Sequence, residues 1–374
     1  MTLSWFGAGI RLAAATTAIF ASSIAAGAIE PAASDAAARM LRLSENVYVI
    51  EHDDATDEWP HGNTGVIVGR TGLFVIDSCY LPSRAKADIA LIRRVTEKPV
   101  RFLMTTHWHF DHNNGAVAYR DAFPGVTLIA ERETARWIEL NQNYWKALSI
   151  APGSARRDAL AKLEAELARG VGEDGKPFSQ AERDRRASVI AKRHNELDEL
   201  AALTIVTPTQ LFDGRISLDF EGTPIEIVAR GPANSPNDST LWLPEQRILF
   251  AGDILVRSPL PYVGASWPVH WAPVLRDLEA VPVSFIVPGH GPVMTDHAYT
   301  RAVRELMETT LTRVEALVRA GRNLPQVQDE LNLDDVRARV PQWNGSDVSE
   351  EDWVATRRAL AERAFMGLRG QGGL

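Results

Sequence analysis

Hydrophobic and polar positions divide the chain into two strand-rich halves. In the first half, short apolar runs predict strands at 47–50, 64–69, 73–77, 99–105 and 126–130. In the second half, similar runs predict strands at 215–220, 225–229, 240–243, 248–251 and 284–287. Apolar positions at helical spacing predict a helix at 83–97, and a further helix is expected near 271–280. Two strand-rich halves that each carry helices indicate a layered α/β architecture.

A long charged segment, about residues 131–204, separates the two halves. Leu160, Leu163 and Leu167 form one apolar helical stripe, and residues 179–182 read Ser-Gln-Ala-Glu, a capping-box pattern that opens a second helix. We therefore predict an inserted helical hairpin within a domain that spans 29–320. Residues 321–374 are predicted to form a C-terminal helical extension.

The N-terminus has the composition of a secretory signal peptide. Arg11 precedes an Ala-rich, weakly apolar run that ends in Ala26-Gly27-Ala28, and no acidic residue occurs before Glu30. We predict a signal peptide over 1–28 and a periplasmic or secreted protein, with an uncleaved anchor or amphipathic leader as the other interpretation. Residues 29–40 resemble a flexible lead-in. No other segment is apolar enough to span a bilayer, so stable membrane anchoring after cleavage is not expected.

Charge and cysteine content narrow the function classes. The formal net charge is −8, from 40 basic and 48 acidic residues, and no basic stripe stands out, which argues against nucleic-acid binding. Cys79 is the one cysteine, so an intrachain disulfide is excluded, and a small packed thiol is expected there. The expected partner is a small-molecule substrate, while the pattern does not predict an oligomeric state.

The strongest chemical signal is a His-rich segment directly after the predicted strand at 99–105. His107, His109, Asp111 and His112 lie within six residues, although the whole chain has only 9 histidines. Alternation aims His107 and His109 to one side of an extended backbone, while Asp111 and His112 follow a turn and face a second point. Neutral imidazole and carboxylate are preferred ligands of zinc and similar divalent ions.

This His-x-His-x-Asp-His pattern resembles the signature of the metallo-β-lactamase superfamily. Two later motifs fit in order: Ala251-Gly252-Asp253 resembles the bridging aspartate, and residues 287–291, Val-Pro-Gly-His-Gly, resemble the last histidine ligand. The resemblance implies an αββα sandwich of two mixed β-sheets flanked by helices, with metals at one edge. It further implies one site with His107 and His109, a second with Asp111, His112 and His290, and Asp253 between them.

The implied cofactor is Zn²⁺, with iron or manganese left open, and the implied chemistry is metal-assisted hydrolysis in which Asp111 also orients the water. One position departs from the pattern. Asn234 stands where the family usually has a third histidine for the first site. Because a carboxamide oxygen is a weaker zinc ligand than imidazole, the first site is expected to be looser. Three interpretations follow: an enzyme with an altered site, a site rescued by His61 or His270, and a catalytically weak descendant.

We expect a hydrolase that acts on an ester, thioester, lactone or amide-like bond. A β-lactamase is the runner-up, because family members with that activity usually carry cysteine or serine where this chain has Asp253. A metal- or ligand-binding protein that kept the fold is the third hypothesis.

Several side chains outside the motifs have more than one possible role. Trp59 is a candidate for a flap, and Trp137, Tyr144 and Trp145 either line a pocket or pack in the hairpin. His61 is expected to be solvated, and surface positions are expected for His52, His194 and His297.

Overall fold

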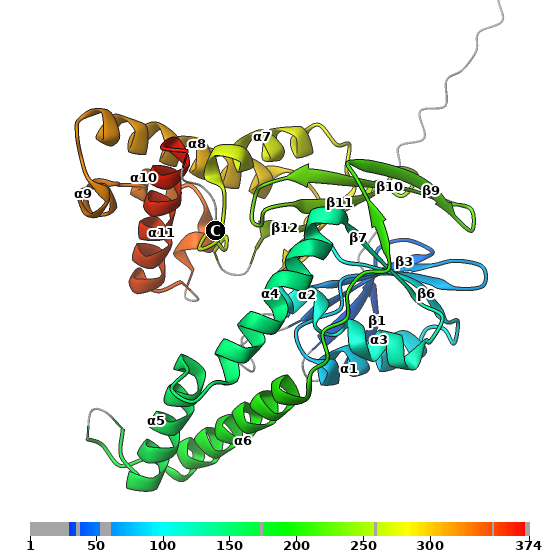
Figure 1. Ribbon diagram of the computed structural model, residues 1–374, viewed down its shortest axis with the longest axis horizontal. Coiled ribbons are helices and arrows are strands. Elements are labelled where there is room, and N and C mark those ends of the chain that lie inside the picture. The colour runs from blue at the N-terminus through cyan, green and yellow to red at the C-terminus, as the bar shows by residue number, and fades with distance from the viewer. Residues whose placement is uncertain are drawn as a thin grey trace, which may run out of the picture.

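Two mixed β-sheets face each other, and helices cover both outer faces (Figure 1). The computed structural model describes residues 30–34, 38–52, 61–172, 175–257, 260–345 and 348–370. The predicted αββα sandwich is therefore confirmed. The predicted signal peptide and Trp59 lie outside the described residues.

The first sheet contains eight strands in chain order: β1 (Glu30–Ser34), β2 (Ala38–Arg42), β3 (Val47–His52), β4 (Thr64–Val68), β5 (Leu73–Ile76), β6 (Val100–Met104), β7 (Thr127–Glu131) and β8 (Gln210–Phe212). Strands are antiparallel from β1 to β5 and parallel from β5 to β8. Helices α1 (Pro82–Arg93) and α3 (Ala116–Ala122) pack on its outer face. The expected flexible lead-in at 29–40 is wrong, because β1 and β2 occupy most of it. Met40 of β2 is buried under the helices and Leu41 is buried between the sheets.

The second sheet has the order β13-β12-β11-β10-β9, built from β9 (Arg215–Phe220), β10 (Thr223–Gly231), β11 (Asp238–Leu243), β12 (Ile248–Val256) and β13 (Phe285–His290). β12 and β13 are parallel, and the other pairs are antiparallel. Apolar side chains from both sheets fill the space between them, including Phe74, Leu241 and Phe250. Burial of this apolar layer is the main stabilising contribution to the sandwich.

The C-terminal helices extend the outer layer of the second sheet. Beyond α7 (Pro268–Glu279) and α8 (Ala298–Arg319) the chain forms α9 (Leu324–Glu330), α10 (Asp334–Arg337), the short 3-10 helix η2 (Pro341–Asn344) and α11 (Glu350–Leu368). Trp343 and Trp353 from this region share one apolar cluster with Trp271 of α7 and Leu306 of α8. The predicted C-terminal helices are present, and they pack on the sandwich through a common core.

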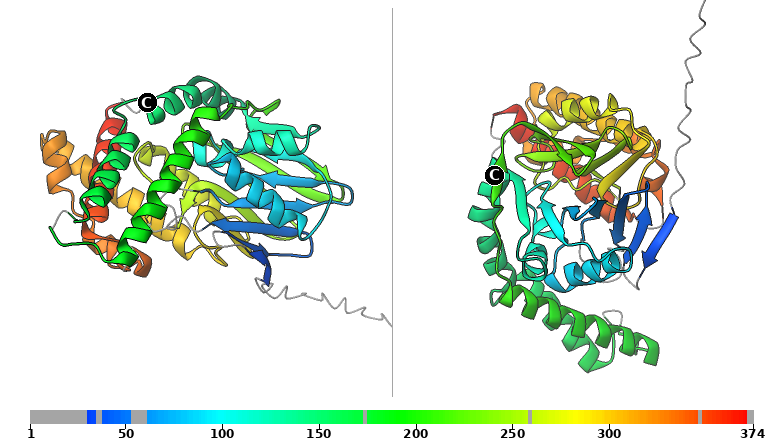
Figure 2. Two further views of the ribbon diagram at one scale, coloured as in Figure 1. Left: turned by 90° about the horizontal axis from the view of Figure 1, so that it is seen from below. Right: turned by 90° about the vertical axis from the view of Figure 1, so that its right-hand side faces the viewer.

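The segment between the halves contains three helices: α4 (Arg132–Ile150), α5 (Ala155–Arg169) and α6 (Gln180–Ala202). α5 and α6 form the predicted hairpin, which projects from the body of the molecule (Figures 1 and 2). The predicted capping box is present, because Ser179 and Glu182 exchange hydrogen bonds at the start of α6. In the described part of the chain, none of the helices is both long and apolar enough to cross a membrane.

Candidate metal centre

The predicted site residues meet at one edge of the sandwich, where strands from both sheets end. The His-rich segment follows β6 and turns into the short helix α2 (Phe110–Asn113). Asp253 lies on β12 and His290 ends β13 in the other sheet. Residues separated by 178 positions thus come together because the two halves of the chain pack face to face.

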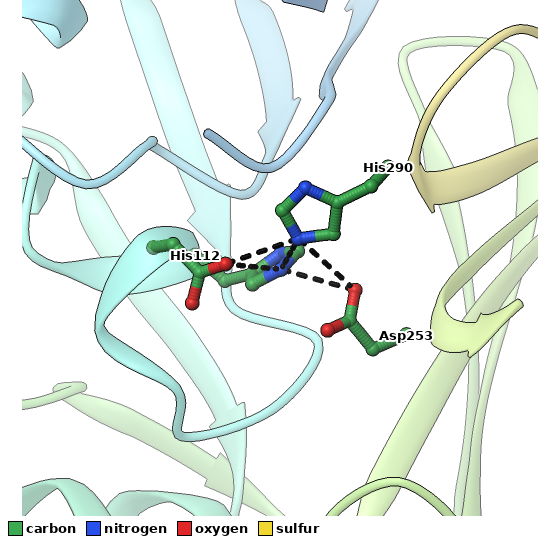
Figure 3. Close-up of side chains that lie close together, drawn as sticks. His112, Asp253 and His290 are labelled. Carbon is green, nitrogen blue, oxygen red and sulfur yellow. Dashed lines mark hydrogen bonds and ion pairs between the residues drawn. The ribbon is translucent and has the colours of Figure 1, made fainter. Parts of the chain in front are cut away.

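Four buried side chains converge on one point. Figure 3 shows His112, Asp253 and His290 directed toward one another from three elements. His112 Nε2 lies 3.2 Å from His290 Nε2 and 3.1 Å from Asp253 Oδ1. Asp111 Oδ2 completes the group, 3.0 Å from His290 Nε2. We call these four side chains the second metal group.

A smaller group lies beside it. His107 Nε2 is 3.0 Å from His109 Nδ1 and 3.6 Å from Asp253 Oδ2. We call His107, His109 and Asp253 the first metal group. Asp253 therefore offers Oδ1 to the second group and Oδ2 to the first. A carboxylate with one oxygen directed at each group is suited to bridge two ions.

Asp77 orients histidines of both groups, although it belongs to none of the sequence motifs. Its Oδ2 accepts hydrogen bonds from His112 Nδ1 and from Thr106 Oγ1, each at 2.8 Å. Thr106 Oγ1 in turn accepts from His107 Nδ1 at 3.1 Å. Such contacts fix the tautomer and ring orientation of a metal-ligating histidine, and here they leave Nε2 of His107 and His112 facing the centre. Asp77 has a φ of 60°, an uncommon conformation for a residue other than glycine. Its place directly after an apolar strand was the available signal.

The electrostatics of the centre favour the ligand forms of His109 and Asp111, whereas the surrounding carboxylates, against the effect of burial, raise the pKa of His112. Burial and the neighbouring His107 lower the pKa of His109 to about 3, so its imidazole is neutral at pH 7. Burial alone would raise the pKa of Asp111, but the His112 and His290 imidazoles hold it at about 2. Buried imidazole nitrogens and ionised carboxylate oxygens, 3.0–3.7 Å apart, fit a divalent cation such as zinc.

Asn234 is fully buried in the loop between β10 and β11. The start of β11, directly after that loop, lies against the residue before the His-rich segment, because Ser239 N donates to Thr106 O. Asn234 Nδ2 donates to Tyr262 O at 2.8 Å, and the Tyr262 ring lies 5.9 Å from the His109 ring. Its Oδ1 accepts no hydrogen bond from the residues that the structure describes. A buried carbonyl oxygen that accepts no hydrogen bond from the described residues is compatible with the weak third ligand expected for the first group.

His61 and His270, the two candidates for a replacement ligand of the first site, belong to neither metal group formed by the described residues. The prediction of a solvated His61 is wrong, because its side chain is 1% exposed. His270 is exposed. His52 is also buried, contrary to the expected surface position, and contacts Cys79 and Asp88. His194 is exposed as expected, whereas His297 is half-buried.

The aromatic candidates divide into two kinds. Trp137 is half-buried and packs 5.6 Å from Trp108, whose ring lies 4.9 Å from the His109 ring. Tyr144 and Trp145 are 59% and 45% exposed, so packing in the interior of the hairpin is not their role. Asp238, which belongs to none of the sequence motifs, is a buried carboxyl whose pKa burial raises to about 6 and whose Oδ2 accepts from Ser235 N.

Comparison with known proteins identifies similar sequences and similar folds. The linear primary-alkylsulfatase of Pseudomonas sp. (strain ATCC 19151) is 22% identical over 269 residues, which cover 70% of this chain and 47% of that protein. This chain thus spans about half the length of that relative. A double mutant of the sec-alkyl sulfatase PisA1 has a similar fold, with a TM-score of 0.62, 16% identity and coverage of 88% of this chain and 50% of the other.

A metallo-beta-lactamase from Pontibacter korlensis also shares the fold, with a TM-score of 0.51, 16% identity and coverage of 72% of this chain and 99% of that one. Residues 57–305, two thirds of the chain, match the family model of the metallo-beta-lactamase superfamily, and they include every residue of both metal groups. The chain therefore belongs to the metallo-beta-lactamase superfamily.

Proposed function

We propose that this protein is a metal-dependent hydrolase that cleaves an ester-type bond in a small molecule. The observation that carries the proposal is the position of Asp253, whose two oxygens face two neighbouring groups of imidazole and carboxylate ligands. We propose zinc as the cofactor, held by Asp111, His112, Asp253 and His290 and more weakly by His107, His109, Asp253 and Asn234. Six of these side chains are the ligand set expected from the family resemblance.

A divalent ion held there supplies Lewis acidity and lowers the pKa of water. The side chains of this chain supply the rest. Asp111, whose pKa is about 2, remains ionised at neutral pH and accepts a hydrogen bond from a water at the centre, which orients that water. Asp77 keeps the Nε2 atoms of His107 and His112 directed inward. Burial of these groups excludes bulk water and strengthens their electrostatic interactions.

Sulfate esters of apolar alcohols are the substrate class that we place first among ester-type bonds. Both alkylsulfatase relatives motivate this choice, and the surface beside the centre supports it. The Trp137 ring packs on Trp108, whose ring contacts His109 of the metal centre. Trp137 begins one face of α4, and the same face continues with Leu140, Tyr144 and Leu148. These positions recur at helical spacing on one side of the helix.

The outer face of α4 is unusually apolar for an exposed surface. Leu140, Tyr144 and Leu148 are 62%, 59% and 44% exposed. Exposed apolar patches of this kind mark interaction sites more often than isolated exposed side chains do. An apolar substrate chain that extends from the metal centre along α4 would bury part of this face. Carboxylic esters, thioesters and lactones are the next substrate classes that we propose. We rank β-lactams last, because Asp253 stands where enzymes with that activity are expected to carry cysteine or serine.

A hydrolysis screen on protein of measured zinc content tests the proposal. The panel contains an alkyl sulfate, an aryl ester, a thioester, a lactone and a chromogenic β-lactam, each with wild type and Asp253→Ala. We expect turnover of at least one ester-type substrate, with loss of activity in the variant. Zinc-loaded wild type without turnover of any substrate would favour the hypothesis of a binding protein. Preference for the β-lactam would contradict the order proposed here.

A further inference from the structure

A second buried polar cluster lies behind the metal centre and is not part of it. His52 Nε2 is 2.9 Å from Asp88 Oδ1, and Asp88 Oδ2 accepts from Thr64 Oγ1 at 3.1 Å and from Cys79 Sγ at 3.0 Å. All four side chains are buried. We call them the anchor cluster. Burial and the Asp88 carboxylate raise the pKa of Cys79, so the thiol keeps its proton and donates to that carboxylate.

The anchor cluster holds the backbone of residues 62–64. His52 Nδ1 donates to Gly62 O at 2.9 Å, and Thr64 itself belongs to the cluster. The segment is therefore fixed at both ends by buried hydrogen bonds. In a low-dielectric interior such bonds are strong, and their loss leaves costly unpaired groups.

Residues 62–64 in turn contact the second metal group. Gly62 N donates to Asp111 O at 3.2 Å. A Cβ added to Gly62 would lie 2.4 Å from His112 Cε1, so the Gly62 backbone packs directly against the His112 ring.

Asn63 secures the strand end that carries His290. Its backbone N donates to Gly289 O at 2.7 Å, and its Nδ2 donates to Pro288 O at 3.0 Å and to Gly291 O at 2.8 Å. The three-residue segment thus touches the surroundings of Asp111, His112 and His290. The first metal group has no such contact with this segment among the hydrogen bonds of the described residues.

We propose that His52, Asp88 and Cys79 are positioning residues that set the metal affinity of the second group through residues 62–64. The inference rests on the metal binding proposed above. Disturbing the cluster releases the Gly62 carbonyl and loosens the packing against the His112 ring. Loss of supporting contacts around metal ligands costs about 10–100-fold in affinity.

The test measures zinc affinity by chelator competition and the melting temperature of the metal-free protein. Asp88→Asn, His52→Gln and Cys79→Val are compared with Cys79→Ser, which keeps a donor to Asp88. Thr310→Val is the matched control, because it removes a buried hydroxyl that donates to Leu306 O within α8, in the outer helical layer on the second sheet. His112→Ala identifies the binding step that belongs to the second group.

We expect the second-group dissociation constant to rise about tenfold or more in the first three variants, with the first group changed less and Cys79→Ser close to wild type. Thr310→Val should lower the melting temperature without changing either affinity. In the metal-free protein, the amides of residues 62–64 should exchange faster in Asp88→Asn than in wild type. This readout and the milder Cys79→Val variant keep the test decisive if a variant binds metal too weakly to measure.

Unchanged second-group affinity in all three variants would overturn the positioning role while leaving the proposed hydrolase intact. Wild type that binds no zinc would instead refute the proposed function. Cobalt-loaded wild type provides a further check. Because Cys79 is the one cysteine of the chain, a thiolate-to-cobalt charge-transfer band would show that the cluster is itself a metal site, which would also overturn the inference.

Discussion

Asn234 differs in kind from the other proposed ligands, because it offers a neutral amide oxygen. Asn234→His places an imidazole at this position and should strengthen zinc binding at the first group. A tenfold gain corresponds to about 1.4 kcal/mol of binding free energy. Competitive chelator titration of both proteins measures the change. Two equally tight zinc ions in the wild type would contradict the weak-site account.

Asp111 combines a ligand role with the orientation of water. Asp111→Ala should lower the hydrolytic rate by about 10²- to 10⁴-fold, because both an ordered hydrogen bond and a metal ligand are lost. Steady-state kinetics with zinc in excess over the protein measures the effect, and circular dichroism serves as the folding control. Wild-type rates with metal still bound would show that the chemistry takes place elsewhere.

Among single residues, those that belong to a sequence motif could be predicted as metal ligands. His107, His109, Asp111 and His112 are dense in a short segment, so their chemistry is visible without a structure. Supporting residues lack such a signal. Asp77 and Asn63 make contacts that depend on how loops from distant parts of the chain pack, and each resembles an ordinary loop residue in sequence. Burial of His52 and His61 could not be predicted for the same reason.

The close packing of β13 against β12 fixes the position of the bridging Asp253 carboxylate. A Cβ on Gly289 would lie 1.9 Å from Asp253 Oδ1 and 2.8 Å from Gly252 C, so only glycine fits there without displacement. Gly289→Ala should displace Asp253, weaken both metal groups and cost about 1–3 kcal/mol of stability. Gly125→Ala is the matched control, since no atom lies within 4 Å of its added Cβ. Zinc titration and thermal melting check the pair, and equal behaviour of the two variants would contradict this role of Gly289.

Elements with a strong internal pattern were predicted well. The strands at 47–50, 73–77 and 215–220 match β3, β5 and β9 to within a few residues. β1 and β2 were missed, since residues 30–38 are rich in alanine, which has low strand propensity, and the two strands depend on pairing of β1 with β2 and of β2 with β3. α4 was included in the helical segment, but its outward apolar face could not be assigned before its neighbours were known.

At the scale of the whole molecule, export remains a prediction that rests on Ala26-Gly27-Ala28. Expression in a Gram-negative host should give a periplasmic protein whose N-terminus lies near Ile29. N-terminal sequencing of the periplasmic and cytoplasmic fractions measures this. Ala28→Trp should block processing, because signal cleavage needs a small residue there. Exported protein with an intact Met1 would contradict cleavage.

The sandwich brings ligands from both halves of the chain to one edge, and Asp253 lies between the two groups. Calorimetric titration of zinc into metal-free wild type and Asp253→Ala tests this arrangement most directly. The account predicts two binding steps in wild type, the tighter at Asp111, His112, Asp253 and His290, and a weakening of both steps in Asp253→Ala. A variant that loses affinity at one step while the other is unchanged would contradict the shared carboxylate on which the proposed function depends.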